Sequence, residues 1–195
     1  MNTLITILLV LAAVIVLLLA LALFTRKTYS LKREIKIGKP LEEVFNFLRY
    51  LRNQEHFSKW VMMDPNMKKQ FKGTDGSVGF VYAWDGNKQA GKGEQELKGI
   101  SEGERIDVEV RFIKPFEGIA KTPFTTKSIS ENETLVTWGM TSTLKYPMNL
   151  MLLFMNMDKL LGKDLETSLL TLKKILEKNQ HPEKVFQERR SLPLN

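Results

Sequence analysis

The segment MDKLLGKDLETSLLTLKKILE, residues 157–177, decides the fold of this chain. Its apolar side chains recur at helical spacing and form one stripe, while its lysines and glutamates lie mainly off that stripe. The stripe consists of Met157, Leu161, Leu165, Leu169, Leu172 and Leu176. This pattern is typical of a long helix that buries one face against other elements. We expect an amphipathic helix over Asp158–Lys178, ended by His181-Pro182.

The chain before this helix reads as a series of short strands. In Arg105–Lys114, apolar residues alternate with charged ones, and Asp85-Gly86-Asn87 is a strong hairpin signal. We expect Val78, Phe80, Tyr82 and Trp84 to share one face. The expected strands are Tyr29–Ile37, Met67–Phe71, Val78–Trp84, Gly91–Ile100, Arg105–Lys114, Glu117–Ser130 (irregular around Pro123) and Thr134–Leu144. Consecutive hairpins of this kind build an antiparallel sheet.

Short helices are expected after the first strand. Pro40–Leu51 has apolar residues at helical spacing, a proline suited to the first turn, and acidic residues near the positive end of the helix dipole. Asn53–Trp60 continues as a helical or turn segment. The order strand, short helices, antiparallel strands and one long helix predicts an α+β fold.

Four segments in this order resemble the START-like superfamily, and most closely its bacterial polyketide-cyclase/dehydrase branch (SRPBCC proteins). They are IKIGKPLEEVFNFL at 35–48, VGFVYAWDGNKQAGKGEQELKGISEGERIDVEVRFIKPFE at 78–117, TLVTWGM at 134–140, and the helix at 157–177. The resemblance covers about Tyr29–Lys178. It implies a helix-grip fold, in which a curved antiparallel sheet wraps a long C-terminal helix with an apolar cavity between them. Family members bind lipids, sterols or polyketides, some are enzymes, and some bind chaperone partners.

Thr3–Phe24 is the other dominant stretch, because it holds no charge, proline or glycine. As a helix it spans roughly 33 Å, enough for the hydrocarbon core of a bilayer. A cleaved signal peptide is the alternative, since Ala20-Leu21-Ala22 has the small-x-small form of a cleavage site. The run is longer than a usual signal-peptide core and lacks basic residues before it. We therefore expect one uncleaved transmembrane helix.

The charges beside this span predict its orientation. Arg26, Lys27, Lys32 and Arg33 follow it, which places the C-terminal domain in the cytoplasm. Much of the net charge of +7 is thus juxtamembrane and suits anionic headgroups. No nucleic-acid motif appears. The chain has no cysteine, which excludes disulfides and thiolate chemistry.

Apolar side chains provide the best candidates for a ligand site. The resemblance implies that strand residues point toward the long helix and line the cavity. The candidates are Phe80, Tyr82, Trp84, Phe112, Phe124, Trp138, Met140, Phe154, Met157 and Leu161. The alternative is that these residues fill a core, which burial preference favours for most of them.

The apolar run Met148–Met155 has two interpretations. It is either a flexible gate at the cavity mouth, touching the bilayer, or a buried connection into the long helix. An apolar run this short does not distinguish the two.

Catalytic and metal-binding chemistry has few candidates. His56 can act as an acid or base if it faces the cavity, but a surface or packing histidine is the favoured alternative. His181 precedes a proline in the tail. Asp85 lies near the central hairpins, and Glu94 and Glu96 are expected on the outward face. Two histidines and no cysteine predict no metal site and no cofactor.

The sequence therefore predicts an anchor with a basic flank at 1–28, a START-like domain at 29–180 and a polar tail at 181–195. The leading hypothesis is a membrane-anchored binding module for a hydrophobic small molecule or lipid. The alternatives are a cyclase or dehydratase using the same cavity, and a module that holds a protein partner at the membrane. Membrane lipids are expected partners, and nucleic acid is not.

Overall fold

The structure is a computed structural model that describes residues 2–178, so the predicted polar tail, with His181, lies outside the described residues. Its helices are α1 (Thr3–Phe24), α2 (Leu41–Arg49), α3 (Gln54–Phe57), α4 (Met151–Phe154) and α5 (Met157–Lys178), with 3-10 turns η1 (Leu51–Asn53), η2 (Val61–Met63) and η3 (Met148–Leu150). Its strands are β1 (Thr28–Ile37), β2 (Lys68–Lys72), β3 (Val81–Asp85), β4 (Lys92–Ser101), β5 (Arg105–Lys114), β6 (Gly118–Lys121), β7 (Phe124–Ser130) and β8 (Glu133–Thr143).

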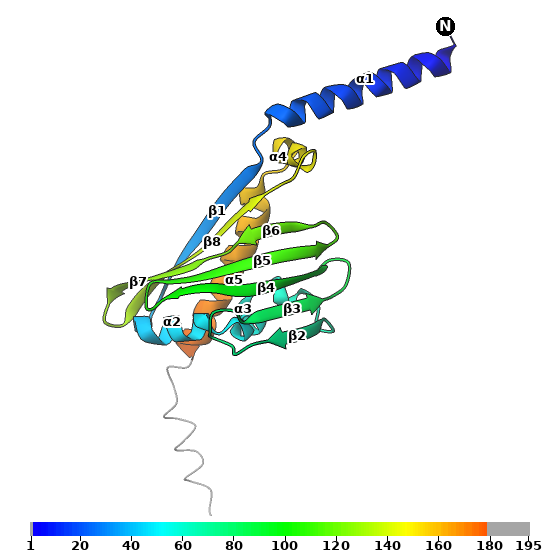
Figure 1. The fold of residues 1–195 in the computed structure, drawn as a ribbon. Coiled ribbons are helices and arrows are strands. Elements are labelled where there is room, and N and C mark those ends of the chain that lie inside the picture. Colours follow the sequence, from blue (N-terminus) through cyan, green and yellow to red (C-terminus); the bar gives the residue numbers. More distant parts are fainter. Residues whose placement is uncertain (1, 179–195) are drawn as a thin grey trace, which may run out of the picture.

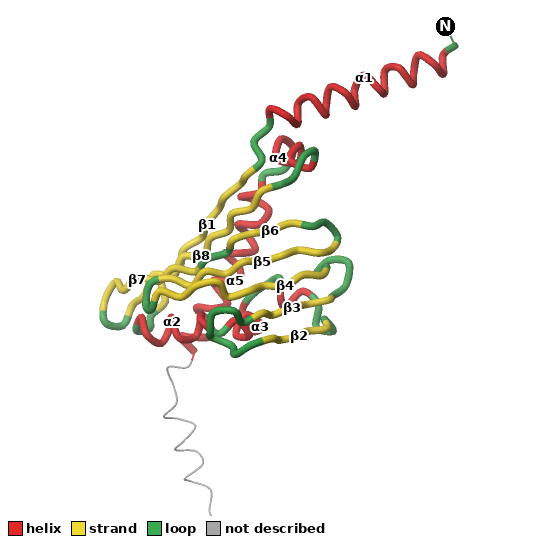
Figure 2. Tube along the Cα trace, viewed as in Figure 1, coloured by secondary structure: helices red, strands yellow, loops and turns green. Residues whose placement is uncertain are grey.

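The strands form one antiparallel sheet in the order β1-β8-β6-β5-β4-β3-β2, with β7 paired to β5 and β8. The first strand of the sequence pairs with the last along its whole length, from Thr28 opposite Thr143 to Ile37 opposite Thr134. Figure 1 shows this sheet wrapping around α5, and Figure 2 shows the strands as one layer against that helix. The predicted α+β helix-grip fold is confirmed.

The helix α5 buries the stripe that the sequence predicts. Leu165, Leu169, Leu172 and Leu176 belong to the core cluster, together with inward residues of the sheet. Arg33 fixes the start of the helix, because its guanidinium forms an ion pair with Asp158 at 2.9 Å and lies against Gly162. A side chain at position 162 would displace that guanidinium, so the glycine leaves room for Arg33 beside the helix.

Two of the predicted elements differ in the structure. The single strand expected over Glu117–Ser130 is two strands, β6 and β7, because the chain turns at Thr122-Pro123 and β7 leaves β6 to pair mainly with β8. The prediction that Val78 and Phe80 share one face of a strand is also wrong. β3 begins only at Val81, and Val78 is exposed in the preceding turn while Phe80 is buried.

The helix α1 stands apart from the domain, as Figure 1 shows. It is long and apolar enough to cross a bilayer. Of its side chains only Ala22 is buried, where η3 packs against the last turn of the helix. Its leucines, isoleucines and valines are all exposed, by 36% to 65%.

Candidate functional site

A cavity of about 290 Å³ lies between the inner face of the sheet, the α3–η2 segment and the beginning of α5. This volume is close to the lower end of the roughly 300–1,000 Å³ typical of ligand pockets. The lining comprises Tyr29, Gln54, Ser58, Trp60, Val61, Met63, Met67, Tyr82, Trp84, Gln89, Ala90, Gln95, Val110, Phe112, Lys114, Pro115, Thr122, Trp138, Met140 and Leu161.

Aromatic rings build much of the wall. Trp138 stacks on Phe124 with ring centroids 4.6 Å apart, and it meets Trp60 edge to face at 5.7 Å. Trp84 lies over Gly93, where an added Cβ would come within 2.7 Å of the indole ring. All three tryptophans of the chain line the cavity. Their fluorescence therefore reports on its contents.

The indole N–H groups of the three tryptophans differ in their partners. Trp60 Nε1 donates to Asp164 Oδ2 at 3.1 Å, and Trp84 Nε1 donates to the carbonyl oxygen of Ala90 at 3.1 Å. Trp138 is 2% exposed, and its Nε1 has no hydrogen-bond partner among the described residues. A buried donor without a partner costs about 1–3 kcal/mol, so an acceptor that reached this nitrogen would stabilise the protein.

Other polar groups in the wall are neutral. Gln54, Ser58 and Gln95 are buried, and their side chains take part in none of the hydrogen bonds found within residues 2–178. Thr122 is buried as well, with its hydroxyl 3.5 Å from the carbonyl oxygen of Val108. The cavity thus offers several uncharged donors and acceptors within an apolar wall.

The deep part of the cavity carries no ionised group. Burial, together with the nearby Glu55 carboxylate, raises the pKa of Tyr82. Burial also raises the pKa of Tyr29, so both phenols stay protonated near neutral pH. Among the described lining residues there is no histidine or carboxylate, and Lys114 stands exposed at the rim. This arrangement favours a neutral ligand.

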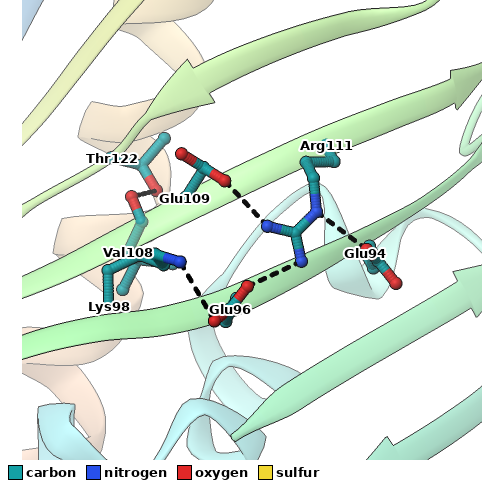
Figure 3. A network of polar contacts seen from close by, with 7 residues as sticks. All are labelled: Glu94, Glu96, Lys98, Val108, Glu109, Arg111 and Thr122. Carbon is teal, nitrogen blue, oxygen red and sulfur yellow. Dashed lines mark hydrogen bonds and ion pairs between the residues drawn. The ribbon is translucent and has the colours of Figure 1, made fainter. Parts of the chain in front are cut away.

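The outer face of the same strands has the opposite character. Arg111 lies among Glu94, Glu96 and Glu109 at 2.7, 2.8 and 2.7 Å, and Lys98 pairs with Glu96 (Figure 3). The hydrogen bonds from Arg111 and Lys98 lower the pKa of Glu96. Glu94 and Glu96 therefore lie on the outward face, as predicted, and Asp85 pairs with Lys92 at the exposed hairpin.

The structure brings most of the predicted ligand-binding side chains to one cavity. Those that line it are Tyr82, Trp84, Phe112, Trp138, Met140 and Leu161. Phe80 and Phe124 are buried in the core behind the wall. Phe154 and Met157 lie elsewhere, in a separate and more polar groove beside the start of β1. Whether the lining residues bind a ligand stays a prediction.

Two questions that the sequence left open are answered by position. His56 is exposed on α3 and is not among the lining residues, so it does not face the cavity as acid–base chemistry would require. The Met148–Met155 segment is not a gate at the cavity mouth either, because none of its residues line the cavity and η3 packs against α1 instead. Nor is it simply a buried connection, since Leu153 and Phe154 are exposed.

Sequence reasoning missed the polar part of the wall. Gln95 lies in phase with Gly93 and Leu97 on β4, so strand alternation alone places it inward. Gln54 begins α3, Ser58 directly follows its last residue, and both are buried. Within residues 2–178 no cluster of histidine, cysteine and carboxylate side chains suits a metal ion.

Comparison with known proteins supports the fold alone. No protein-family profile matches the chain, and no curated protein matches it by sequence. Norcoclaurine synthase from Thalictrum flavum, in complex with dopamine and hydroxybenzaldehyde, aligns with a TM-score of 0.59 and 8% identity, covering 80% of this chain and 91% of that chain. A protein from Chromobacterium violaceum aligns with a TM-score of 0.54 and 14% identity, covering 76% and 96%. One from Nitrosospira multiformis aligns with a TM-score of 0.52 and 18% identity, covering 74% and 94%.

Proposed function

We propose that this protein is a membrane-anchored binding module that holds a neutral hydrophobic small molecule or lipid between the sheet and α5. The buried indole N–H of Trp138 carries this assignment. It belongs to an apolar cavity wall and has no partner among the described residues. A ligand that places a carbonyl, ether or hydroxyl oxygen there would recover the free energy lost by the unpaired donor.

The character of the wall narrows the class of ligand. Apolar rings and methionines favour an apolar body, and Met63, Met67 and Met140 adapt to varied shapes. The uncharged groups Gln54, Ser58 and Gln95 favour a few polar atoms. A buried anionic or cationic headgroup would lack a counter-charge inside the cavity, which makes an ionised ligand unfavourable.

Membrane anchoring is supported by α1 and its junction with the domain. Its exposed apolar side chains need an apolar environment, because water would face nearly all of them. The domain also contacts the last turns of the helix, where Asn149 and Tyr146 donate to the carbonyl oxygens of Ala22 and Leu19. Cleavage after Ala22 would destroy part of this junction, so these contacts favour a retained anchor over a signal peptide.

The cavity rim supports a ligand taken from the bilayer. Gln89, Ala90, Lys114 and Pro115 line the cavity near the β3–β4 and β5–β6 turns. In Figure 1, α1 leaves the domain toward the same side as these turns. A domain tethered by the short segment 25–27 would keep this rim within reach of the membrane.

The enzyme alternative has less support from the wall. Acid–base catalysis needs a titratable group poised near the working pH. The tyrosines of the wall, Tyr29 and Tyr82, have raised pKa values, so both stay protonated near neutral pH and do not act as bases there. Norcoclaurine synthase shares the fold at 8% identity, so its chemistry does not transfer to this chain.

The direct test is native mass spectrometry of the full-length protein extracted from its own membranes. We expect a stoichiometric adduct of a neutral apolar molecule, together with an intact N-terminal helix. A protein that is consistently free of adduct, and that binds no neutral apolar probe in the assay below, would overturn the binding proposal. A mature chain that begins after residue 22 would overturn the anchor.

A matched pair of probes tests the role of Trp138. Tryptophan fluorescence would follow binding of 2-acetylnaphthalene, which carries a carbonyl acceptor, and of 2-ethylnaphthalene, which does not. We expect Trp138→Phe to weaken binding of the ketone by about fivefold, the value of one hydrogen bond, and to leave the hydrocarbon unchanged. Trp60→Phe is the control, because Trp60 already donates to Asp164. Equal effects of both substitutions on both probes would exclude a hydrogen bond from Trp138.

A further inference from the structure

A cluster of exposed apolar side chains lies where the domain meets α1. It is formed by Tyr146, Met148, Leu153, Phe154, Met155 and Leu160, from η3, α4 and the residues around them. Phe154 is 77% exposed and Leu153 is 55% exposed. Proteins rarely leave such clusters facing water, and those that exist commonly mark an interaction surface.

The cluster is joined to the end of α1 by specific hydrogen bonds. Asn149 is fully buried, and its Nδ2 donates to the carbonyl oxygens of Ala22 at 2.7 Å and Thr25 at 3.1 Å. The hydroxyl of Tyr146 donates to the carbonyl oxygen of Leu19 at 3.3 Å. The last carbonyls of a helix lack partners within the helix, so Asn149 caps α1 from a distant turn. These hydrogen bonds therefore fix the level of α4, meaning its position along the axis of α1, near the end of that helix.

That level coincides with a bilayer surface if α1 crosses the membrane. The helix is about as long as a hydrocarbon core is thick, so its final turn lies near the headgroups. Arg26 and Lys27 follow directly, and Lys145 and Lys159 border the apolar cluster. Apolar side chains rimmed by basic ones are the combination that binds a membrane interface.

We propose that the segment 146–155 is a membrane seat, in which Leu153 and Phe154 insert into the bilayer at the boundary between headgroups and acyl chains. The proposal rests on the membrane anchoring of α1. The seat holds the domain at a second point beside the anchor, which stops the domain from swivelling about the linker. A bilayer is the occupant because Asn149 and Tyr146 bind α1 within its last turns, where lipid surrounds the helix.

Single-cysteine labelling tests the seat, since the natural chain has no cysteine. Phe154→Cys in the full-length protein would be labelled with nitrobenzoxadiazole and reconstituted in phosphatidylcholine vesicles. Phosphatidylcholine with a doxyl group high on its acyl chain would serve as the quencher. We expect quenching several times stronger at position 154 than at Ile129→Cys, a similarly labelled control on β7, which Figure 1 places at the far end of the domain from α1.

A third label separates the two possible failures. Leu11→Cys lies midway along α1 and should be quenched by a doxyl group deep in the bilayer. Quenching at 11 with none at 154 overturns the seat and leaves the anchor intact, and it would turn the cluster into a candidate site for a protein partner. The absence of quenching at 11 overturns both the anchor and the seat.

Discussion

The polar groups on the two faces of β4 and β5 differ in whether they have partners. On the outer face, Arg111 lies among three glutamates and every one of these charges has a partner (Figure 3). On the inner face, Gln95 points toward the cavity without an ion pair or hydrogen bond to a described side chain. Paired charges at the surface are stabilised by one another, whereas the unpaired neutral groups beside the cavity have no such partner among the described residues. This contrast supports the proposal that a ligand binds at the inner face.

The largest expected loss of stability comes from truncating a packed side chain on the inner face. Leu97 is fully buried on β4, and Leu97→Ala should lower the free energy of unfolding by about 2–5 kcal/mol, because it removes apolar contacts and leaves a void. Urea unfolding of the full-length protein in detergent, followed by circular dichroism, measures the loss. The adjacent outward substitution Lys98→Ala should change stability by less than about 0.5 kcal/mol. Equal losses at both positions would contradict the assignment of faces.

The next effect comes from filling the space beneath Trp84. In Gly93→Ala the new methyl group would meet the indole ring and the carbonyl oxygen of Arg111, within 2.7 and 2.6 Å. We expect a loss of about 1–3 kcal/mol from overpacking, and a shift in tryptophan emission as Trp84 moves away from Ala90. The control is Gly99→Ala on the same strand, where the nearest atom would lie at an ordinary 3.5 Å. An unchanged emission spectrum in Gly93→Ala would show that Trp84 does not depend on this glycine.

A smaller effect follows from removing the positive charge on the outer face. Arg111→Met leaves three glutamates close together, and we expect a loss of about 1 kcal/mol near neutral pH, reduced by solvent screening. The pKa of Glu96 is lowered in the folded protein, so its contribution is present above the ordinary value of 4.5 and is lost as the pH falls through the lowered value. The difference between wild type and variant should therefore shrink in acid.

Urea titrations of both proteins at a series of pH values measure this difference. Arg105→Met is the control, because Arg105 pairs with Asp107 alone and its removal leaves one carboxylate rather than three. If Arg111→Met lowers the free energy of unfolding by the same amount at every pH, including acid pH, then Arg111 acts through packing and not through charge.

The smallest expected effect is the pH dependence of ligand binding. The described wall has no histidine or carboxylate, and its tyrosines have raised pKa values. Binding of 2-acetylnaphthalene should therefore change by less than about twofold between about pH 6 and about pH 9. A bell-shaped profile would reveal a titrating group at the site and would favour the enzyme alternative.

Much of the fold could be predicted because it depends on local patterns. The alternation in β5 and the stripe in α5 recur at regular spacing. Each spacing is typical of one type of element and indicates which face of it is buried. The division of 117–130 into β6 and β7 could not be predicted, because a proline marks a break without saying which strand the chain joins next. Part of the site was predictable in the same way, since strand alternation indicates which side chains point inward, and it places Tyr82, Trp84, Phe112, Trp138 and Met140 there.

From the sequence it was possible to predict the α+β order of elements, the apolar inner face and a helix long enough to span a bilayer. Those properties follow from periodicity and length, which are local. The tertiary structure was needed to show that the indole N–H of Trp138 lacks a partner among the described residues, while those of Trp60 and Trp84 have one, and that Asn149 caps α1. These facts depend on which distant groups approach within hydrogen-bond distance, and spacing along a chain does not encode that geometry.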